Sequence, residues 1–118
     1  MIDSTITVGI PFTNETNASH LKKSINSIVN QTLIVDCIHL IQDGEISEEL
    51  SDLINTYSDK YSNIQILSFP KSGLPYILNQ SIKRCKTKYY ARMDSDDIAF
   101  TSRIEKQVRY LNDNTNID

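Results

Sequence analysis

Four consecutive residues, Asp94-Ser95-Asp96-Asp97, form the densest group of potentially reactive side chains in the sequence. Three carboxylates this close together repel one another unless a cation or a proton neutralises them. Hard oxygen ligands suit Mg²⁺ or Mn²⁺, and a Mg²⁺ site commonly completes its shell with water and substrate phosphates. The segment therefore predicts a divalent metal site that takes a phosphate-bearing substrate.

The same acids allow other interpretations, and the rest of the sequence limits the other chemistries. An EF-hand calcium loop would need an oxygen ligand at its fifth position and glycine at its sixth, where the sequence has Ile98 and Ala99. A plain turn, in which Asp and Ser side chains bond their own backbone, stays open as a structural alternative. The sequence has no Gly-rich phosphate loop, dinucleotide fingerprint or nucleophilic triad with supporting local sequence.

The elements that must position these acids follow from hydrophobic spacing. Strands are expected at 6–10, closed by Pro11, and at 35–41, 64–67 and 88–93. Helices are expected between them and after the last strand, at 18–30, 48–57, 74–85 and 103–111. Their start signals are Asn17, Ser47, Pro75 in a first turn, and a capping box from Ser102 to Glu105.

This alternation predicts an α/β fold, with residues 1–118 forming a single domain. We expect a Rossmann-like, mainly parallel sheet of about four strands with helices on both faces. Ligands of such sheets bind beyond the carboxyl ends of the strands. Three segments are expected at that edge: Pro11 to Glu15, Asp43-Gly44 and Asp94 to Asp97.

Charge and composition narrow the class of protein further. The chain has 118 residues, 39% of them hydrophobic, and a net charge of −3, which argues against broad nucleic-acid binding. The segment from Lys71 to Arg92 holds six bases and no acid, so it is either a solvated surface or a face for an anionic ligand. Cys37 and Cys85 lack the spacing of a zinc or redox motif and are expected in the core of a cytoplasmic protein.

Five segments, in order, give the chain a family resemblance. They are ITVGIPFTN, SINSIVNQT, the strand closing on IQDG, SGLPYILNQSI and YYARMDSDDIAFTSRIEKQVRYL. Together they resemble the amino-terminal, nucleotide-sugar-binding half of family 2 glycosyltransferases, an inverting group with the A-type glycosyltransferase fold. The last segment is the most specific, because a strand, Asp-x-Asp-Asp, an Arg six residues later and a helix occur together.

The resemblance implies roles for individual acids. Asp94-Ser95-Asp96 corresponds to the family's Asp-x-Asp motif. Asp96 would hold the metal, Mn²⁺ or Mg²⁺, that bridges the nucleotide diphosphate, and Asp94 would contact the ribose or a metal-bound water. Asp97 would support them. Asp43 would bind the nucleobase, usually uracil.

It also implies roles for residues that are not acidic. Four residues would form the wall beside the base: Pro11, Phe12, Thr13 and Asn14. Many members have at Thr13 an aromatic residue that stacks on the base, and Phe12 is the candidate substitute. Arg103 corresponds to a common Arg that would order the loop through the acids.

The implied reaction is transfer of a sugar from a nucleoside diphosphate, expected to be UDP, to a hydroxyl of a glycan or lipid-linked acceptor, with inversion. The general base and the acceptor-binding half are expected beyond residue 118. The alternatives are a sugar-phosphate nucleotidyltransferase and a non-catalytic α/β interaction domain. We expect a cytoplasmic protein, peripheral at the inner face of the membrane at full length, with an exposed sheet edge open to self-association.

Overall fold

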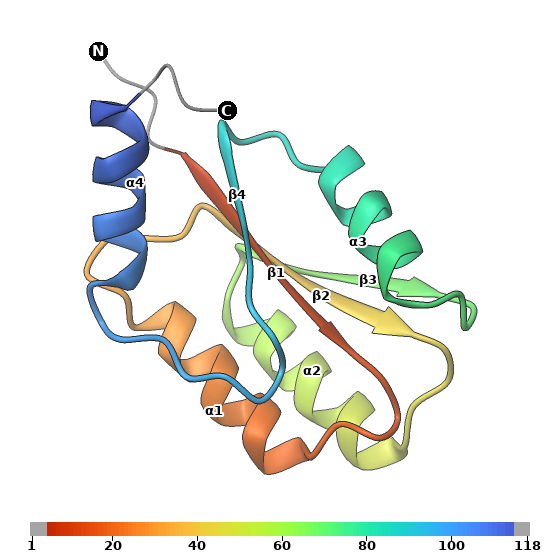
Figure 1. Cartoon of the computed structure of the whole chain (residues 1–118). Helices are drawn as coiled ribbons and strands as arrows, with labels where there is room; N and C mark the ends of the chain where they lie inside the picture. The colour runs from red at the N-terminus through yellow and green to blue at the C-terminus, as the bar shows by residue number, and fades with distance from the viewer. Residues whose placement is uncertain (1–4, 115–118) are drawn as a thin grey trace.

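The computed structural model describes residues 5–114, which form alternating strands and helices (Figure 1). The strands are β1 (Ile6–Phe12), β2 (Cys37–Asp43), β3 (Ile64–Phe69) and β4 (Tyr89–Arg92). The helices are α1 (Ala18–Val29), α2 (Glu48–Lys60), α3 (Leu74–Lys83) and α4 (Arg103–Asp113). The expected order of elements is confirmed.

All four strands run parallel in one sheet, in the order β3-β2-β1-β4. Strand β1 lies inside the sheet, with Val8 opposite Ile38 of β2 and Ala91 of β4. Its seven residues are all buried, which explains its apolar character. The carboxyl ends of all four strands meet at one edge, where the sequence places its candidate site residues.

Strand β1 extends through Pro11, which was expected to close it. Pro11 pairs with Ile41 of β2 and Phe12 with Gln42. The Gly9 carbonyl accepts from the Met93 amide, so Gly9 faces β4, and Pro11, two residues on, faces the same way. The ladder between β1 and β4 ends at Gly9 and Arg92, so the missing N–H of Pro11 leaves no ladder bond unmade.

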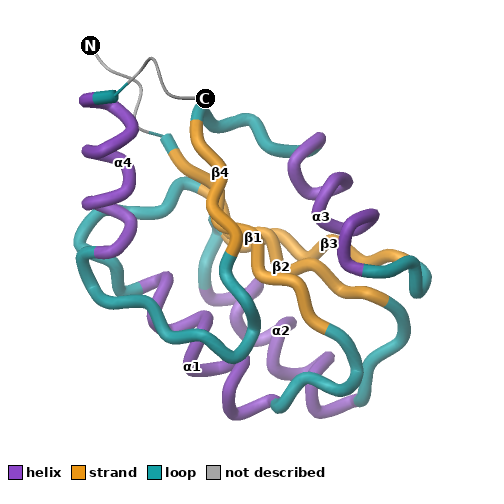
Figure 2. Tube along the Cα trace, in the orientation of Figure 1, coloured by secondary structure: helices purple, strands orange, loops and turns teal. Residues whose placement is uncertain are grey.

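Helices cover both faces of the sheet (Figures 1 and 2). Helices α1, α2 and α4 pack on the face that holds the main hydrophobic core, and α3 covers the opposite face. The chain moves outward through β1, β2 and β3 and then returns across the sheet to β4. Right-handed crossovers put a helix that returns in this way on the other face, which accounts for the place of α3.

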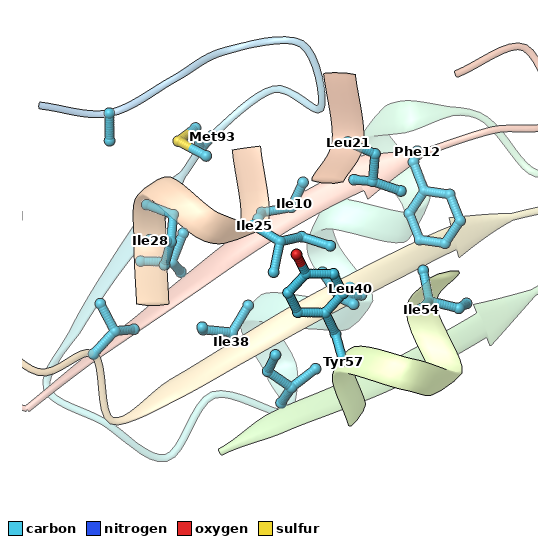
Figure 3. Packing of buried hydrophobic residues seen from close by; sticks show 14 of the residues in the cluster. Ile10, Phe12, Leu21, Ile25, Ile28, Ile38, Leu40, Ile54, Tyr57 and Met93 are labelled. Atoms are coloured by element: carbon cyan, nitrogen blue, oxygen red, sulfur yellow. The ribbon is translucent and has the colours of Figure 1, made fainter. Parts of the chain in front are cut away.

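The core lies between the sheet and α1, α2 and α4 (Figure 3). Alternate side chains of β1, including Ile10 and Phe12, point toward Leu21 and Ile25 of α1. All four side chains are at most 2% exposed. Full burial of one such side chain contributes about 1.5–3 kcal/mol, so this face fixes α1 firmly against the strands.

Under α3 the contact between helix and sheet is partly polar. The ring nitrogen Nδ1 of His39 on β2 lies 2.8 Å from Oγ of Ser81, which lies 2.8 Å from the hydroxyl of Tyr90 on β4. A Cβ at Gly9 would lie 1.9 Å from that tyrosine oxygen, so β1 has glycine where the ring crosses it. These bonds join α3 to β2 and β4.

Most helix starts agree with the sequence, and one does not. The side chains of Asn17 and Ser47 cap α1 and α2, and Pro75 lies in the first turn of α3. Ser102 precedes α4 but its side chain makes no capping bond. The expected capping box is therefore wrong, because the amide of Ile104 donates instead to Oε1 of Gln31, 2.9 Å away.

The two cysteines are also placed differently from the expectation. Cys37 and Cys85 are free thiols of intermediate burial, rather than core residues. Burial raises the pKa of the Cys37 thiol, and the neighbouring Cys85 and Asp36 raise it further. Cys37 begins β2 and Cys85 precedes β4, so both thiols lie at the amino-terminal edge of the sheet. There the Cys85 thiol lies 3.2 Å from Oγ1 of Thr87.

Candidate functional site

The three segments expected at the carboxyl edge of the sheet are brought together there. Asp43 ends β2, Thr13 follows β1, and Asp94 lies just beyond β4. Neighbouring strands lie about 4.8 Å apart, so β2 and β4 are separated across the sheet by two strand spacings, about 10 Å, with β1 and the loop after it between them. The strand order reverses between β1 and β4, which is where ligands of parallel sheets bind.

The acidic turn after β4 presents its carboxylates to solvent. Asp94, Asp96 and Asp97 are all exposed, and one carboxylate oxygen from each lies within 4.8 Å of the others. The turn is closed by a bond of 3.1 Å from the Asp97 amide to the Asp94 carbonyl. Arg92 pairs with the Asp94 carboxylate at 2.9 Å. The structure thus gathers all three acids and leaves Asp96 and Asp97 without an ion pair among the described residues.

The donor set of this turn fits a small divalent cation. Three carboxylate oxygens from four successive residues offer only hard ligands and leave the remaining coordination positions open to water or phosphate. Mutual repulsion of the acids favours a bound cation over an empty turn. A zinc site with soft ligands does not fit, because no cysteine or histidine joins the cluster.

Asp43 is nearly buried and already binds backbone. Its side chain accepts from the amide of Ser72 at 2.8 Å and from the amide of Gly73 at 3.3 Å. These bonds hold the start of α3 against the end of β2. Gly44 follows at φ 86°, a conformation that favours glycine. A carboxylate has about four acceptor positions and two are used here, so Asp43 keeps the capacity to accept from further donors.

The end of β1 divides the four residues expected beside a base into two pairs, two in the strand and two in the loop that follows. Pro11 is buried, and Phe12 is 2% exposed and packs among the core side chains near Leu21 (Figure 3). The expectation that Phe12 stacks on a base is therefore wrong, because its direction along the strand takes the ring into the core. Thr13 is half-buried and Asn14 exposed, so this pair faces the edge.

Arg103 orders the loop, but not through the acids as expected. Its guanidinium donates to the carbonyl of Arg92 at 3.3 Å, and none of the ion pairs within residues 5–114 involves Arg103. The bond ties the first residue of α4 to the last residue of β4. Arg103 therefore stabilises the ends of the loop that carries the acids.

The basic segment from Lys71 to Arg92 lies mostly at the amino-terminal edge of the sheet, away from the candidate site at the carboxyl edge. Lys83 ends α3, and Lys86 and Lys88 precede β4, so all three lie at the amino ends of the strands (Figure 1). The acidic turn follows the carboxyl end of β4. Only Lys71 and Arg92, at the two ends of the segment, belong to the ligand edge. The reading of the whole segment as a face for the phosphate-bearing substrate is wrong.

Three residues that support the turn were not assigned a role from sequence. Ser24, Ser27 and Gln31 of the SINSIVNQT segment bind the backbone of the loop between Ser95 and Ile104. One signal could have found them. Ser24 and Ser27 occur at helical spacing beside Leu21, Ile25 and Ile28, so polar side chains occupy the buried side of an amphipathic helix, and Gln31 follows its end.

Comparison with known proteins decides the family. The model of the family described as Glycosyl transferase family 2 matches residues 7–117 of the chain. This chain belongs to family 2 of the glycosyltransferases. The expectations of a sugar-phosphate nucleotidyltransferase and of a non-catalytic interaction domain are thereby set aside.

Curated relatives agree with this assignment. The amylovoran biosynthesis glycosyltransferase AmsE of Erwinia amylovora is 33% identical over 98 residues, which is 83% of this chain and 37% of the relative. An uncharacterized glycosyltransferase of Haemophilus influenzae is 42% identical over 100 residues, 83% of this chain and 30% of the relative. The chain thus spans about a third of the length of these relatives.

Solved structures confirm the fold. TarS 1-349 of S. aureus in complex with UDP-GlcNAc matches with a TM-score of 0.80 at 16% identity, over 94% of this chain and 32% of that one. The mannosyltransferase PcManGT of Pyrobaculum calidifontis, in complex with GDP-Man and Mn²⁺, matches at 0.74 and 14% identity, over 92% and 34%. The chain has the A-type glycosyltransferase fold. Within residues 5–114, no helix has the length and apolar character needed to cross a membrane.

Proposed function

We propose that these residues bind the nucleoside-diphosphate sugar of a glycosyltransferase through a divalent metal. The observation that carries the proposal is the convergence, at one edge of the sheet, of three clustered exposed carboxylates with Asp43 and the loop after β1. Support comes from neighbours of the same fold whose structures contain UDP-GlcNAc or GDP-Man with Mn²⁺.

The residues divide between metal, ribose and base. Asp96 and Asp94 hold Mn²⁺ or Mg²⁺ together with the diphosphate, and Asp97 supports them. Asp43 binds the base through its remaining acceptor capacity, with Thr13 and Asn14 beside it. Asp94 also contacts the ribose or a metal-bound water. The acids after β4 and Asp43 of β2 lie on either side of β1, just as the diphosphate and the base of an extended nucleotide lie on either side of the ribose. We propose UDP as the nucleotide.

The chemistry that the site supplies is stabilisation of a leaving group. Transfer of the sugar develops negative charge on the departing diphosphate, and a bound cation stabilises that charge more in the transition state than in the ground state. Inversion requires a general base that activates the acceptor hydroxyl on the opposite face of the sugar ring. We propose that this base and the acceptor site lie outside these 118 residues, in the two thirds of the relatives' length that the chain does not span.

A glycan or lipid-linked acceptor completes the proposed reaction. Relatives include a protein named UDP-Gal:alpha-D-GlcNAc-diphosphoundecaprenol beta-1,3-galactosyltransferase from Escherichia coli, 31% identical over 98 residues. The substrates in its name are a UDP-sugar and a lipid-linked sugar. Together with the amylovoran relative, it supports a role in polysaccharide or lipid-linked glycan synthesis.

Thermal unfolding with UDP or GDP, each with and without Mn²⁺, tests the proposal. A ligand that binds the native state at about 100 times its Kd adds about 2.7 kcal/mol to the free energy of unfolding. We expect a rise in Tm that needs UDP and Mn²⁺ together. The rise should be lost in Asp96→Ala and retained in Asp52→Ala, which removes an exposed carboxylate from α2.

The remaining outcomes separate the parts of the proposal. A rise with GDP and Mn²⁺ in place of UDP would contradict the assignment of uracil to Asp43 while supporting the metal site. A rise with UDP that is the same with and without Mn²⁺ would contradict the metal role of Asp96. No rise with either nucleotide would contradict donor binding by these residues.

A further inference from the structure

A row of three polar side chains supports the acidic turn and the loop that follows it: Ser24 and Ser27 of α1, and Gln31 just after the end of this helix. Ser24 is fully buried, and its one hydroxyl hydrogen is shared between two acceptors, the carbonyl of Ser95 at 2.9 Å and the carbonyl of Asp97. These carbonyls belong to the residues on either side of Asp96. One side chain of α1 therefore holds the backbone of the turn on both sides of Asp96.

Ser27 and Gln31 continue the row along the same loop. The Ser27 hydroxyl donates to the Ser24 carbonyl at 2.7 Å and accepts from the Ala99 amide at 3.0 Å. The Gln31 amide group donates to the Phe100 carbonyl at 2.6 Å. Ser24 and Ser27 lie on one face of α1, and Gln31 follows two residues after the helix ends at Val29, so this stripe of polar side chains holds the loop from the acids to α4.

A second contact joins the turn to the loop after β1. Oγ1 of Thr16 lies 3.5 Å from Oγ of Ser95, and the same oxygen accepts from the amide of Thr13 at 3.0 Å. The middle residue of Asp94-Ser95-Asp96 therefore faces α1 and the β1 loop, while the aspartates on either side of it are exposed. Inward Ser95 and outward acids are consistent with one fixed conformation of the turn.

The stripe opposes the tendency of the acids to separate. Three like charges within 4.8 Å repel one another in the metal-free protein, and repulsion alone would open the turn. Helix α1 can resist this because Leu21, Ile25 and Ile28, on the same side as Ser24, fix it in the core. A rigid helix that holds the backbone of the turn keeps the carboxylates arranged before a cation binds.

We propose that Ser24 is a positioning residue of the donor site: by holding the Ser95 and Asp97 carbonyls, it fixes Asp94, Asp96 and Asp97 in the arrangement that binds the divalent cation and the donor diphosphate. This inference rests on the proposed function. Ser27 and Gln31 extend the support to the rest of the loop. Outer residues that orient metal ligands typically change metal affinity by about 10–100-fold when they are replaced.

The affinity of the chain for Mn²⁺ with UDP, measured by titration calorimetry well below Tm, tests the inference. We expect Ser24→Ala to weaken it by about tenfold or more. The matched control is Ser51→Ala, since Ser51 is a helical serine of α2 whose hydroxyl accepts from Asn55 of the same helix. The control should bind as the wild type does.

Amide hydrogen exchange in the metal-free protein gives a readout independent of ligand. We expect faster exchange at the Asp97 and Ala99 amides in Ser24→Ala, with the exchange of β1 and β2 amides unchanged. A purely structural role in the core would instead lower Tm and leave the exchange of the turn and the Mn²⁺ affinity of the folded protein as in the wild type. If Ser24→Ala does not fold, Ser27→Ala removes the next bond in the row and is measured in the same way.

The outcomes distinguish this inference from the function on which it rests. A wild-type chain that binds no Mn²⁺ with UDP would contradict the proposed donor site itself. A wild type that binds, together with a folded Ser24→Ala variant that binds within twofold of it, would overturn the positioning role alone.

Discussion

At the scale of single residues, His39 shows how a buried ionisable group links stability to pH. It is 1% exposed, and burial lowers the pKa of its imidazole, as does the positive charge of Arg84, while a bond to Gln65 opposes them. Its neighbour Ser81 is fully buried and is hydrogen-bonded to both His39 and Tyr90. Burial raises the pKa of the Tyr90 hydroxyl. The neutral form of His39 is therefore the form that the folded protein favours.

The stability of the protein should consequently fall on mild acidification. An unfolded histidine takes up a proton below pH about 6.5, whereas His39 in the fold does so only at lower pH. The contribution of neutral His39 to the free energy of unfolding should be complete above pH about 6.5 and should be lost as the pH falls toward the lowered pKa. Urea unfolding at pH 7.5 and pH 5.5 measures this. His39→Gln, which retains a polar side chain but does not titrate, should show a smaller decrease, and equal decreases would contradict the assignment.

At the scale of elements, the start of α4 shows where local sequence rules fail. The spacing from Ser102 to Glu105 has the form of a capping box, yet the cap comes from Gln31, more than seventy residues earlier in the chain. The Ser102 backbone has φ −105° and ψ 10°, so it lacks the extended conformation from which a capping side chain reaches the helix. A rule based on neighbouring residues cannot include a partner from a distant part of the chain, here Gln31 just after the end of α1.

This difference predicts that two substitutions affecting the start of α4 have unequal effects on stability. Gln31→Leu removes the acceptor of a buried amide and should lower the free energy of unfolding by about 1–3 kcal/mol. Ser102→Ala removes a side chain without a capping bond and should change it by less than about 0.5 kcal/mol. Urea unfolding of both variants measures the contrast. A Ser102→Ala variant as unstable as Gln31→Leu would show that the capping box forms after all.

The strands and the other helix starts were predictable because their determinants are local. Alternating Ile6, Val8 and Ile10 predicted β1, and Asn17 and Ser47 cap as their positions predicted. The acids of the site were predictable for the same reason, since all three lie within four residues. Phe12 continues the same alternation, so its direction follows once β1 is extended past Pro11, where the sequence was expected to close it. The partners of Ser24 were not predictable, because they depend on how α1 packs against the finished sheet.

At the scale of the whole molecule, the sheet separates two regions of opposite charge. The acidic turn lies at the carboxyl edge, and the run from Lys83 to Lys88 lies at the amino edge, with no ion pair to it among residues 5–114. The charge sequence alone could not give this division, because the two regions are close in the chain and a strand places them at opposite ends. Self-association across the open edge of β4 stays a prediction.

The distance between these regions should decide whether the bases assist the donor site. From Lys88 to Asp94, on either side of β4, the chain advances six residues, which at about 3.3 Å each span about 20 Å. At physiological salt the Debye length is about 8 Å, so charges at the amino edge are screened from a diphosphate at the other edge. Replacing Lys83, Lys86 and Lys88 together by Gln should therefore leave the affinity for UDP with Mn²⁺ within twofold of the wild type. Asp96→Ala, measured by the same calorimetric titration, should abolish binding. A tenfold loss in the triple variant would mean that the basic run acts on the donor after all, and that screening across the sheet is weaker than this argument requires.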